Sequence, residues 1–166
     1  MHKTAVMSEC RNYRYQLGRR WGKGASTMYF IMLNPSTADH ETDDATIKRC
    51  IHFAQREGFD GLAVMNLFAF RATNPADLWK VEDPIGPGNM DTFQRWLGDM
   101  RRDDSVVVCA WGGGKGAVAE GKRMRHRLHF IGVRPMCLGH TQAGAPNHPL
   151  YLRGDTPLIP WKGYRK

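Results

Sequence analysis

Residues 28–37 read MYFIMLNPST, and this stretch decides what kind of fold the chain adopts. Its apolar part, 28–33, shows no alternation of apolar and polar residues, which is typical of a strand buried on both faces of a parallel sheet. The run stops at Asn34, and Pro35 biases the backbone of Asn34 toward extended geometry. Ligands of open α/β sheets bind outside the carboxyl ends of the strands, so Asn34 is a candidate site residue.

Further strands are expected on both sides of this one. Apolar runs at 61–70 and 105–112 predict two more buried strands, and a last strand is expected near 134–139. Residues 10–22 mix aromatics with arginines that are expected to stay in solvent, and they predict an antiparallel hairpin or edge strand. The proline-broken tail 155–161 is expected to pack as an extended cap.

Helical segments separate these strands. Apolar residues at helical spacing predict a helix capped by Asp43 or Asp44, and further helices at about 89–102 and 115–128. The alternation of strands and helices predicts an α/β fold of a single domain over 1–166. We expect a three-layer α/β/α sandwich with a mainly parallel central sheet, plus the N-terminal antiparallel hairpin or edge strand.

Composition excludes several classes of protein. No apolar stretch reaches the roughly 20 residues that span a bilayer, and the N-terminus lacks the apolar segment of a secretory signal. We therefore expect a cytoplasmic monomer with no membrane partner. Cys10, Cys50, Cys109 and Cys137 contain no C-x-x-C pair, so no disulfide framework, metal site or cofactor is expected. Cys50 and Cys109 are interpreted as reduced core thiols.

The net charge of +8 is unevenly distributed. Residues 1–23 carry +5, residues 24–114 carry −5, and residues 115–166 carry +8. If the two basic ends converge on one face, they form the electrostatic footprint expected for a polyanion such as nucleic acid. A scattered, solubilising charge explains the numbers equally well.

Polar groups follow several of the predicted strands. Asn66 interrupts an apolar run, and a buried amide there either ties down a loop or reads the donor and acceptor edge of a nucleobase. His148 lies in a loop before Pro149, where most histidines are simply exposed. Asp39 and Asp44 offer a general base near Asn34, although helix capping explains at least one member of this acidic cluster.

The segment WGGGKGAVAE at 111–120 only superficially resembles a phosphate-binding P-loop. That motif requires a hydroxyl residue after the lysine, and here Gly116 follows Lys115, which excludes an ATPase of this type. The glycines still open a helix whose N–H groups can hold an anion such as a DNA phosphate. A flexible turn between strand and helix is an equally good interpretation.

Four motifs, FIMLNPS, VMNLFAFR, VVVCAWG and HPLYL, resemble in order those of the uracil-DNA glycosylase superfamily. Its first motif reads GINPG or GMNPG in two branches, so the resemblance implies a catalytic role for the amide of Asn34. The base-reading strand LNAVLTVR of the classical branch is similar to MNLFAFR, which places Asn66 in the base pocket. The closing motif HPS resembles His148 and Pro149, with Leu150 in place of the serine that grips phosphate.

A closer resemblance covers nearly the whole chain. The segments MLNPSTAD, DDATIKRC, NLFAFRATNP and HPLYL, together with TPLIPW, are similar to the signature of a bacterial and phage family of unassigned function, DUF1643. This resemblance implies a family and a fold and leaves the activity to the more distant superfamily motifs.

The leading hypothesis is hydrolysis of an N-glycosidic bond to a uracil-like or modified base flipped out of DNA. Asn34 would orient the water, with Asp39 or Asp44 nearby, and His148 would stabilise the departing base. The expected base-binding residues are Asn66, Phe68, Phe70, Pro35 and Tyr151. The expected phosphate or nucleic-acid contacts are Ser36, Arg71, Gly113, Lys115, Arg19, Arg20, Lys122, Arg123 and Arg153.

Two alternatives remain open at this point. The chain is either a non-catalytic module that binds a modified base or a nucleotide, or a hydrolase of free nucleosides or nucleotides. Leu150 in the place of serine favours the binding module slightly, and for the third hypothesis the basic ends are incidental.

Overall fold

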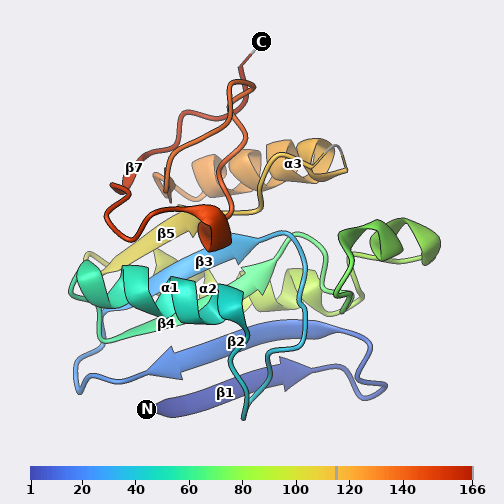
Figure 1. Ribbon diagram of the computed structural model, residues 1–166, viewed down its shortest axis with the longest axis horizontal. Coiled ribbons are helices and arrows are strands. Elements are labelled where there is room, and N and C mark those ends of the chain that lie inside the picture. Colours follow the sequence, from blue (N-terminus) through green and yellow to red (C-terminus); the bar gives the residue numbers. More distant parts are fainter. Residues whose placement is uncertain (115, 166) are drawn as a thin grey trace.

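The computed structural model describes residues 1–114 and 116–165 and contains one seven-stranded mixed sheet (Figure 1). The strands are β1 (His2–Met7), β2 (Arg14–Arg20), β3 (Thr27–Met32), β4 (Gly61–Asn66), β5 (Ser105–Cys109), β6 (Met136–Cys137) and β7 (Ile159–Pro160). Their order across the sheet is β1-β2-β4-β3-β5-β6-β7. The expected α/β fold and its N-terminal hairpin are confirmed.

Only the centre of the sheet is parallel. Strands β4, β3, β5 and β6 run in the same direction, whereas β1, β2 and β7 pair antiparallel with their neighbours. The predicted parallel core and the predicted antiparallel N-terminal hairpin are therefore confirmed, whereas the sequence does not predict the antiparallel β7 at the other edge. The tail predicted as an extended cap contributes β7, which pairs with β6.

Two predicted strands are shorter than their apolar runs. Strand β4 ends at Asn66, and the N–H groups of Leu67 and Phe68 still donate to the carbonyls of Met32 and Leu33. The N–H groups of Ala69 and Phe70 then donate to the carbonyls of Ile85 and Pro84 instead. Similarly, β5 ends at Cys109. Apolar composition continues past both strand ends because these segments stay buried, so hydropathy alone does not mark where the ladder stops.

The helices lie on both faces of the sheet, with α1 in front and α2 behind in Figure 1. Asp44 caps α1 by accepting a hydrogen bond from the Ile47 N–H, as one of the two predicted caps. None of the described helices is long and apolar enough to cross a membrane. The elements are α1 (Ala45–Arg56), α2 (Asn89–Met100), α3 (Ala117–Phe130) and two short 3₁₀ helices, η1 (Pro75–Lys80) and η2 (Pro149–Tyr151).

Strand β3 supplies both hydrophobic cores, which explains its uninterrupted apolar sequence. Tyr29 and Ile31 pack in a cluster that includes buried residues of α2 and α3. Met28, Phe30 and Met32 point to the other face and pack in a cluster with the buried residues of α1. Successive side chains of a strand point to opposite faces, so a strand covered on both sides must be apolar throughout.

The chain reverses its direction along the sheet at β3. From β3 the connection through α1 leads to β4 on one side, and the connections through α2 and α3 lead to β5 and β6 on the other side. Right-handed crossovers that run in opposite directions must cover opposite faces, as α1 and the other two helices do. The loops after β3 and β5 therefore diverge and leave a crevice at their carboxyl ends.

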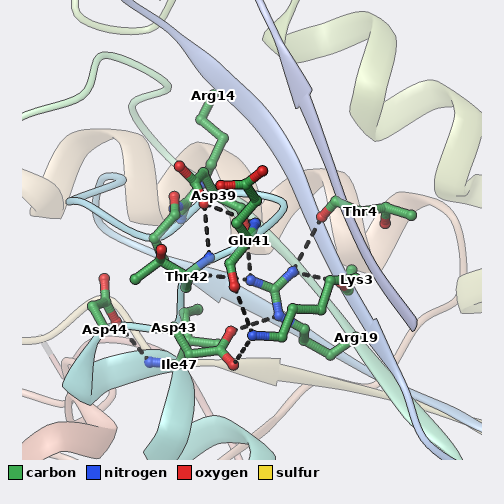
Figure 2. Close-up of polar contacts among 12 residues, drawn as sticks. Lys3, Thr4, Arg14, Arg19, Asp39, Glu41, Thr42, Asp43, Asp44 and Ile47 are labelled. Atoms are coloured by element: carbon green, nitrogen blue, oxygen red, sulfur yellow. Dashed lines mark hydrogen bonds and ion pairs between the residues drawn. The ribbon is translucent and has the colours of Figure 1, made fainter. Parts of the chain in front are cut away.

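Arg19 ties the N-terminal hairpin to the loop before α1 (Figure 2). Its side chain is fully buried, and its Nε donates to Asp43 Oδ1 at 2.6 Å. The other guanidinium nitrogens donate to the backbone carbonyls of Thr4, Gly18, Asp39 and Thr42. The prediction that Arg19 contacts nucleic acid is wrong, because its donors are used inside the protein.

Replacing Arg19 with methionine is expected to destabilise the fold strongly. The substitution removes one member of a buried ion pair and leaves several carbonyls without a donor, which costs about 3–5 kcal/mol. Chemical denaturation measures the change in the free energy of unfolding. Arg153→Met is the matched control, since it breaks an exposed pair with Asp155 and is expected to leave the unfolding midpoint unchanged. Equal effects of the two substitutions would contradict the structural role of Arg19.

Candidate functional site

A cavity of about 410 Å³ lies at the carboxyl ends of the central strands. Its wall is built from the segments that follow β3 and β5, from the end of β4 and from η2. This is the position that the reversal at β3 opens, and the volume lies within the range of ligand pockets. Three of the predicted residues meet in this wall: Asn34, Asn66 and His148.

Asn66 is the last residue of β4, and its side chain is buried, with 2% exposure. Its Nδ2 has no hydrogen-bond partner anywhere in the described part of the chain. A buried donor left unpaired costs about 1–3 kcal/mol, so such groups usually serve a ligand or hold a loop. The side chain lines the cavity, and its unpaired Nδ2 holds no loop in the described part of the chain.

Asn34 joins the loops that follow β3 and β4. Its Nδ2 donates to the carbonyl of Ala72 at 2.7 Å and to that of Pro35 at 3.0 Å. The Ala72 N–H in turn donates to the carbonyl of Pro35 at 2.9 Å. With its two N–H bonds used in this way, the side-chain oxygen is the atom that Asn34 offers to a ligand or a water molecule in the cavity.

His148 is half-buried in the cavity wall, at the start of η2. Its Nδ1 accepts a hydrogen bond from the Leu150 N–H at 3.4 Å, so in the neutral imidazole the hydrogen resides on Nε2. Burial lowers the pKa of His148, and the negative charge of Asp44 opposes this shift. His148 is therefore a neutral hydrogen-bond donor near neutral pH rather than an imidazolium.

The two predicted acidic residues have different positions. Asp44 lines the cavity and also caps α1, so both interpretations of this residue are compatible. Asp39 lies outside the cavity wall, and its Oδ1 accepts hydrogen bonds from the N–H groups of Thr42 and Glu41. These bonds lower the pKa of Asp39. Asp39 thus shapes a turn, and Asp44 is the carboxylate that faces the cavity.

Most of the predicted stacking residues lie elsewhere. Phe68 is buried in the core against Trp79, and the ring of Phe70 packs edge-on against Tyr13. Because the strand stops at Asn66, the alternation that would bring these two rings to the cavity does not continue. Pro35 is buried and also lies outside the wall, whereas Tyr151 is exposed and lies at the edge of the cavity.

The predicted phosphate contacts are divided in the same way. Ser36 and Gly113 line the cavity, and Lys115 lies outside the described residues. The others do not line it: besides Arg19, these are Arg20, Arg71, Lys122, Arg123 and Arg153.

Several of these side chains already have internal partners. Arg20 donates to the Gly24 carbonyl and to Thr27 Oγ1, and Arg71 donates to the Arg11 carbonyl. Arg123 pairs with Glu120, and Arg153 pairs with Asp155. Lys122 lies on the exposed side of α3. Among the described lysines and arginines of the two basic ends, all except Arg14 lie outside the cavity wall.

Arg14 is the cavity residue that the sequence does not reveal. The sequence predicts it in solvent, yet its side chain is buried, with 2% exposure, and it lines the same cavity as Asn34. Alternation along β2 does not reveal it either, because the alternating buried positions are 15, 17 and 19 and residue 14 is out of phase with them.

The cysteines take no part in the site. Cys50 and Cys109 are fully buried, as predicted for core thiols, and burial raises the pKa of each. Within residues 1–114 and 116–165, no group of three or more His, Cys, Asp or Glu side chains is placed to hold a metal ion.

The titration of His148 checks its position in the wall. Because burial lowers its pKa, the folded state binds a proton less readily than the unfolded chain, whose value is about 6.5. The contribution of neutral His148 to the free energy of unfolding is therefore complete above pH ~6.5. It is lost as the pH falls through the lower pKa of the folded state. An NMR titration, assigned with His148→Gln, is expected to give a pKa below 6.5. A value at or above it would place the imidazole in solvent or beside a strong anion.

Comparison with known proteins identifies a family and nothing more specific. No curated protein and no solved structure matches the chain significantly. The relation to uracil-DNA glycosylases therefore has no support beyond the motifs themselves. A family model described as "Protein of unknown function (DUF1643)" matches residues 14–150, a range that contains all the described cavity residues named above except Tyr151. The chain belongs to the DUF1643 family.

Proposed function

We propose that the cavity recognises a nucleobase and that the protein hydrolyses the N-glycosidic bond to a uracil-like or modified base in DNA. The observation that carries this proposal is the buried Asn66 amide, whose Nδ2 has no partner among the described residues and which lies in one wall with Asn34 and His148. The proposal includes the finer assignment of the fold to the uracil-DNA glycosylase-like α/β/α sandwich, which rests on the order of the sequence motifs.

Base recognition follows from the chemistry of the Asn66 amide. A pyrimidine such as uracil presents ring carbonyls beside a ring N–H. The Nδ2 donor of Asn66 binds a carbonyl, and its Oδ1 accepts from the neighbouring N–H. The exposed ring of Tyr151, at the edge of the cavity, is placed to stack on an entering base or sugar.

Three side chains have separate roles in the hydrolytic step. The Asn34 oxygen accepts a hydrogen bond from a water molecule, and that water attacks the anomeric carbon as the C–N bond breaks. Asp44 takes the proton from the water, and the base leaves with the electron pair of the broken bond. The Nε2–H of His148 donates to the negative charge that develops on the base, and one such preorganised donor contributes about 2.7–4 kcal/mol.

A second candidate is a hydrolase or binding protein for free nucleosides or nucleotides. It is favoured by the internal contacts of Arg19 and Arg20, which leave neither residue in the cavity wall to hold a DNA backbone. Leu150 also lines the cavity at the position where the superfamily motif has a phosphate-gripping serine.

Strand cleavage tests the first proposal. Purified protein is incubated with single- and double-stranded oligonucleotides that contain uracil or modified bases, and alkali then breaks the strand at abasic sites. Asn34→Ala is expected to reduce the rate at least ~100-fold, as is typical when a reacting group loses its orientation. Asn12→Ala is the matched control, since Asn12 is exposed and outside the cavity.

The same variants incubated with free nucleosides and nucleotides separate the two candidates. Base release from free compounds alone, lost in Asn34→Ala, selects the second candidate as an enzyme. Binding without base release selects the non-catalytic module. If no nucleobase compound in either panel binds or reacts, the nucleobase proposal is wrong.

A further inference from the structure

Arg14 has a buried guanidinium nitrogen without a partner in the described part of the chain and belongs to the wall of the proposed ligand site. It is the first residue of β2, and it lines the cavity that contains Asn66. Its Nη1 donates to the carbonyl of Ala38, but its Nε is buried without a partner in the described part of the chain. Among residues 1–114 and 116–165, no carboxylate forms an ion pair with Arg14.

Arg19 shows how this same strand satisfies a structural guanidinium. Arg19 and Arg14 are equally inaccessible, with 1% and 2% exposure. Arg19 nevertheless has an ion pair through Nε and backbone acceptors for both of its other nitrogens, all close together in Figure 2. The contacts that hold the hairpin in place therefore account for Arg19 and leave the Nε–Nη2 edge of Arg14 unexplained.

The electrostatic surroundings of Arg14 favour an anion. Burial lowers the pKa of Arg14 to about 10, so the guanidinium is still charged at neutral pH. The negative charges of Asp44 and Asp39 raise this pKa, and the positive charges of Arg71 and Arg19 lower it. Both aspartates have other bonds, Asp44 to the Ile47 N–H and Asp39 within its turn. A buried charge without a paired counter-ion is costly, and a bound anion removes that cost.

We propose that Arg14 binds an oxyanion of the ligand side-on through Nε and Nη2, so that the cavity takes an anionic nucleobase compound. The planar guanidinium matches the two oxygens of a carboxylate or phosphate. Since Arg14 is buried, this group must enter the cavity together with the base. It is therefore the phosphate of a free nucleotide or a carboxylate on the base itself. This ligand class rests on the proposed function, because Asn66 is assigned to the base.

Calorimetric titration of the full chain with matched pairs of probes tests this assignment. The pairs are uridine with uridine 5′-monophosphate, and uracil with uracil-5-carboxylate. In the wild-type protein, the charged member of one pair is expected to bind at least ~10-fold more tightly than its neutral partner. The pair that shows the difference identifies the source of the oxyanion. Equal affinities within both pairs would overturn the assignment.

Substitution of Arg14 provides a second test of the proposed oxyanion site. Arg14→Gln is expected to weaken the charged probe at least ~10-fold and to leave the neutral probe within a factor of about three. Arg153→Gln, at an exposed arginine paired with Asp155, is the matched control and is expected to change neither affinity. Since Arg14 has no carboxylate partner to orphan, the unfolding midpoint of ligand-free Arg14→Gln is expected to equal or exceed that of the wild type. A large fall, or failure to fold, would show a structural arginine and overturn the proposal.

The failure of this proposal is distinguishable from failure of the nucleobase site. If the neutral and charged probes bind equally and both lose affinity in Asn66→Ala, base recognition is supported and the role of Arg14 is overturned. Binding of inorganic phosphate or acetate that is lost in Arg14→Gln, with no binding of any nucleobase, would support the anion site and overturn base recognition.

Discussion

The reversal of direction at β3 is the constraint on which the candidate site depends. The chain moves from β3 to β4 on one side and then to β5 and β6 on the other, so α1 must cover one face and α2 and α3 the other. The loops after β3 and β5 are drawn apart, and the cavity opens between them. The segments that follow β3 and β5 and the last residue of β4 therefore contribute to the cavity wall.

The uneven charge along the chain is explained partly by contacts inside the protein. The basic N-terminal segment meets the acidic segment that precedes α1, where Lys3 and Arg19 both pair with Asp43. This ion-pair cluster fixes the loop that ends at Asp44 and therefore also the carboxylate at the cavity wall. In the sequence this uneven charge resembles the pattern of a nucleic-acid-binding protein. In the structure, part of it serves a contact that stabilises the fold.

The sequence predicts much of the sheet centre and much of the candidate site. Asn34, Asn66 and His148 are predictable because polar residues stand out where apolar runs end or loops turn, and the parallel strands bring such positions together. Arg14 and Arg19 are not predictable in this way. Both are buried on β2 because segments distant in the sequence cover them. The predictions for Phe68 and Phe70 fail for a local reason, because the regular strand ends at Asn66 and the N–H groups of Ala69 and Phe70 bond to the 84–85 segment.

The Asn66 amide at the end of β4 is the group that we propose contacts the nucleobase. An NMR titration of the ¹⁵N-labelled protein with uridine follows the side-chain amide of Asn66 directly, with the exposed side chain of Asn12 as an internal reference. We expect a saturable shift of the Asn66 signal that accompanies a shift of the His148 ring, while the Asn12 signal stays unchanged. Saturable binding of uridine that leaves the Asn66 amide signal unmoved would contradict it.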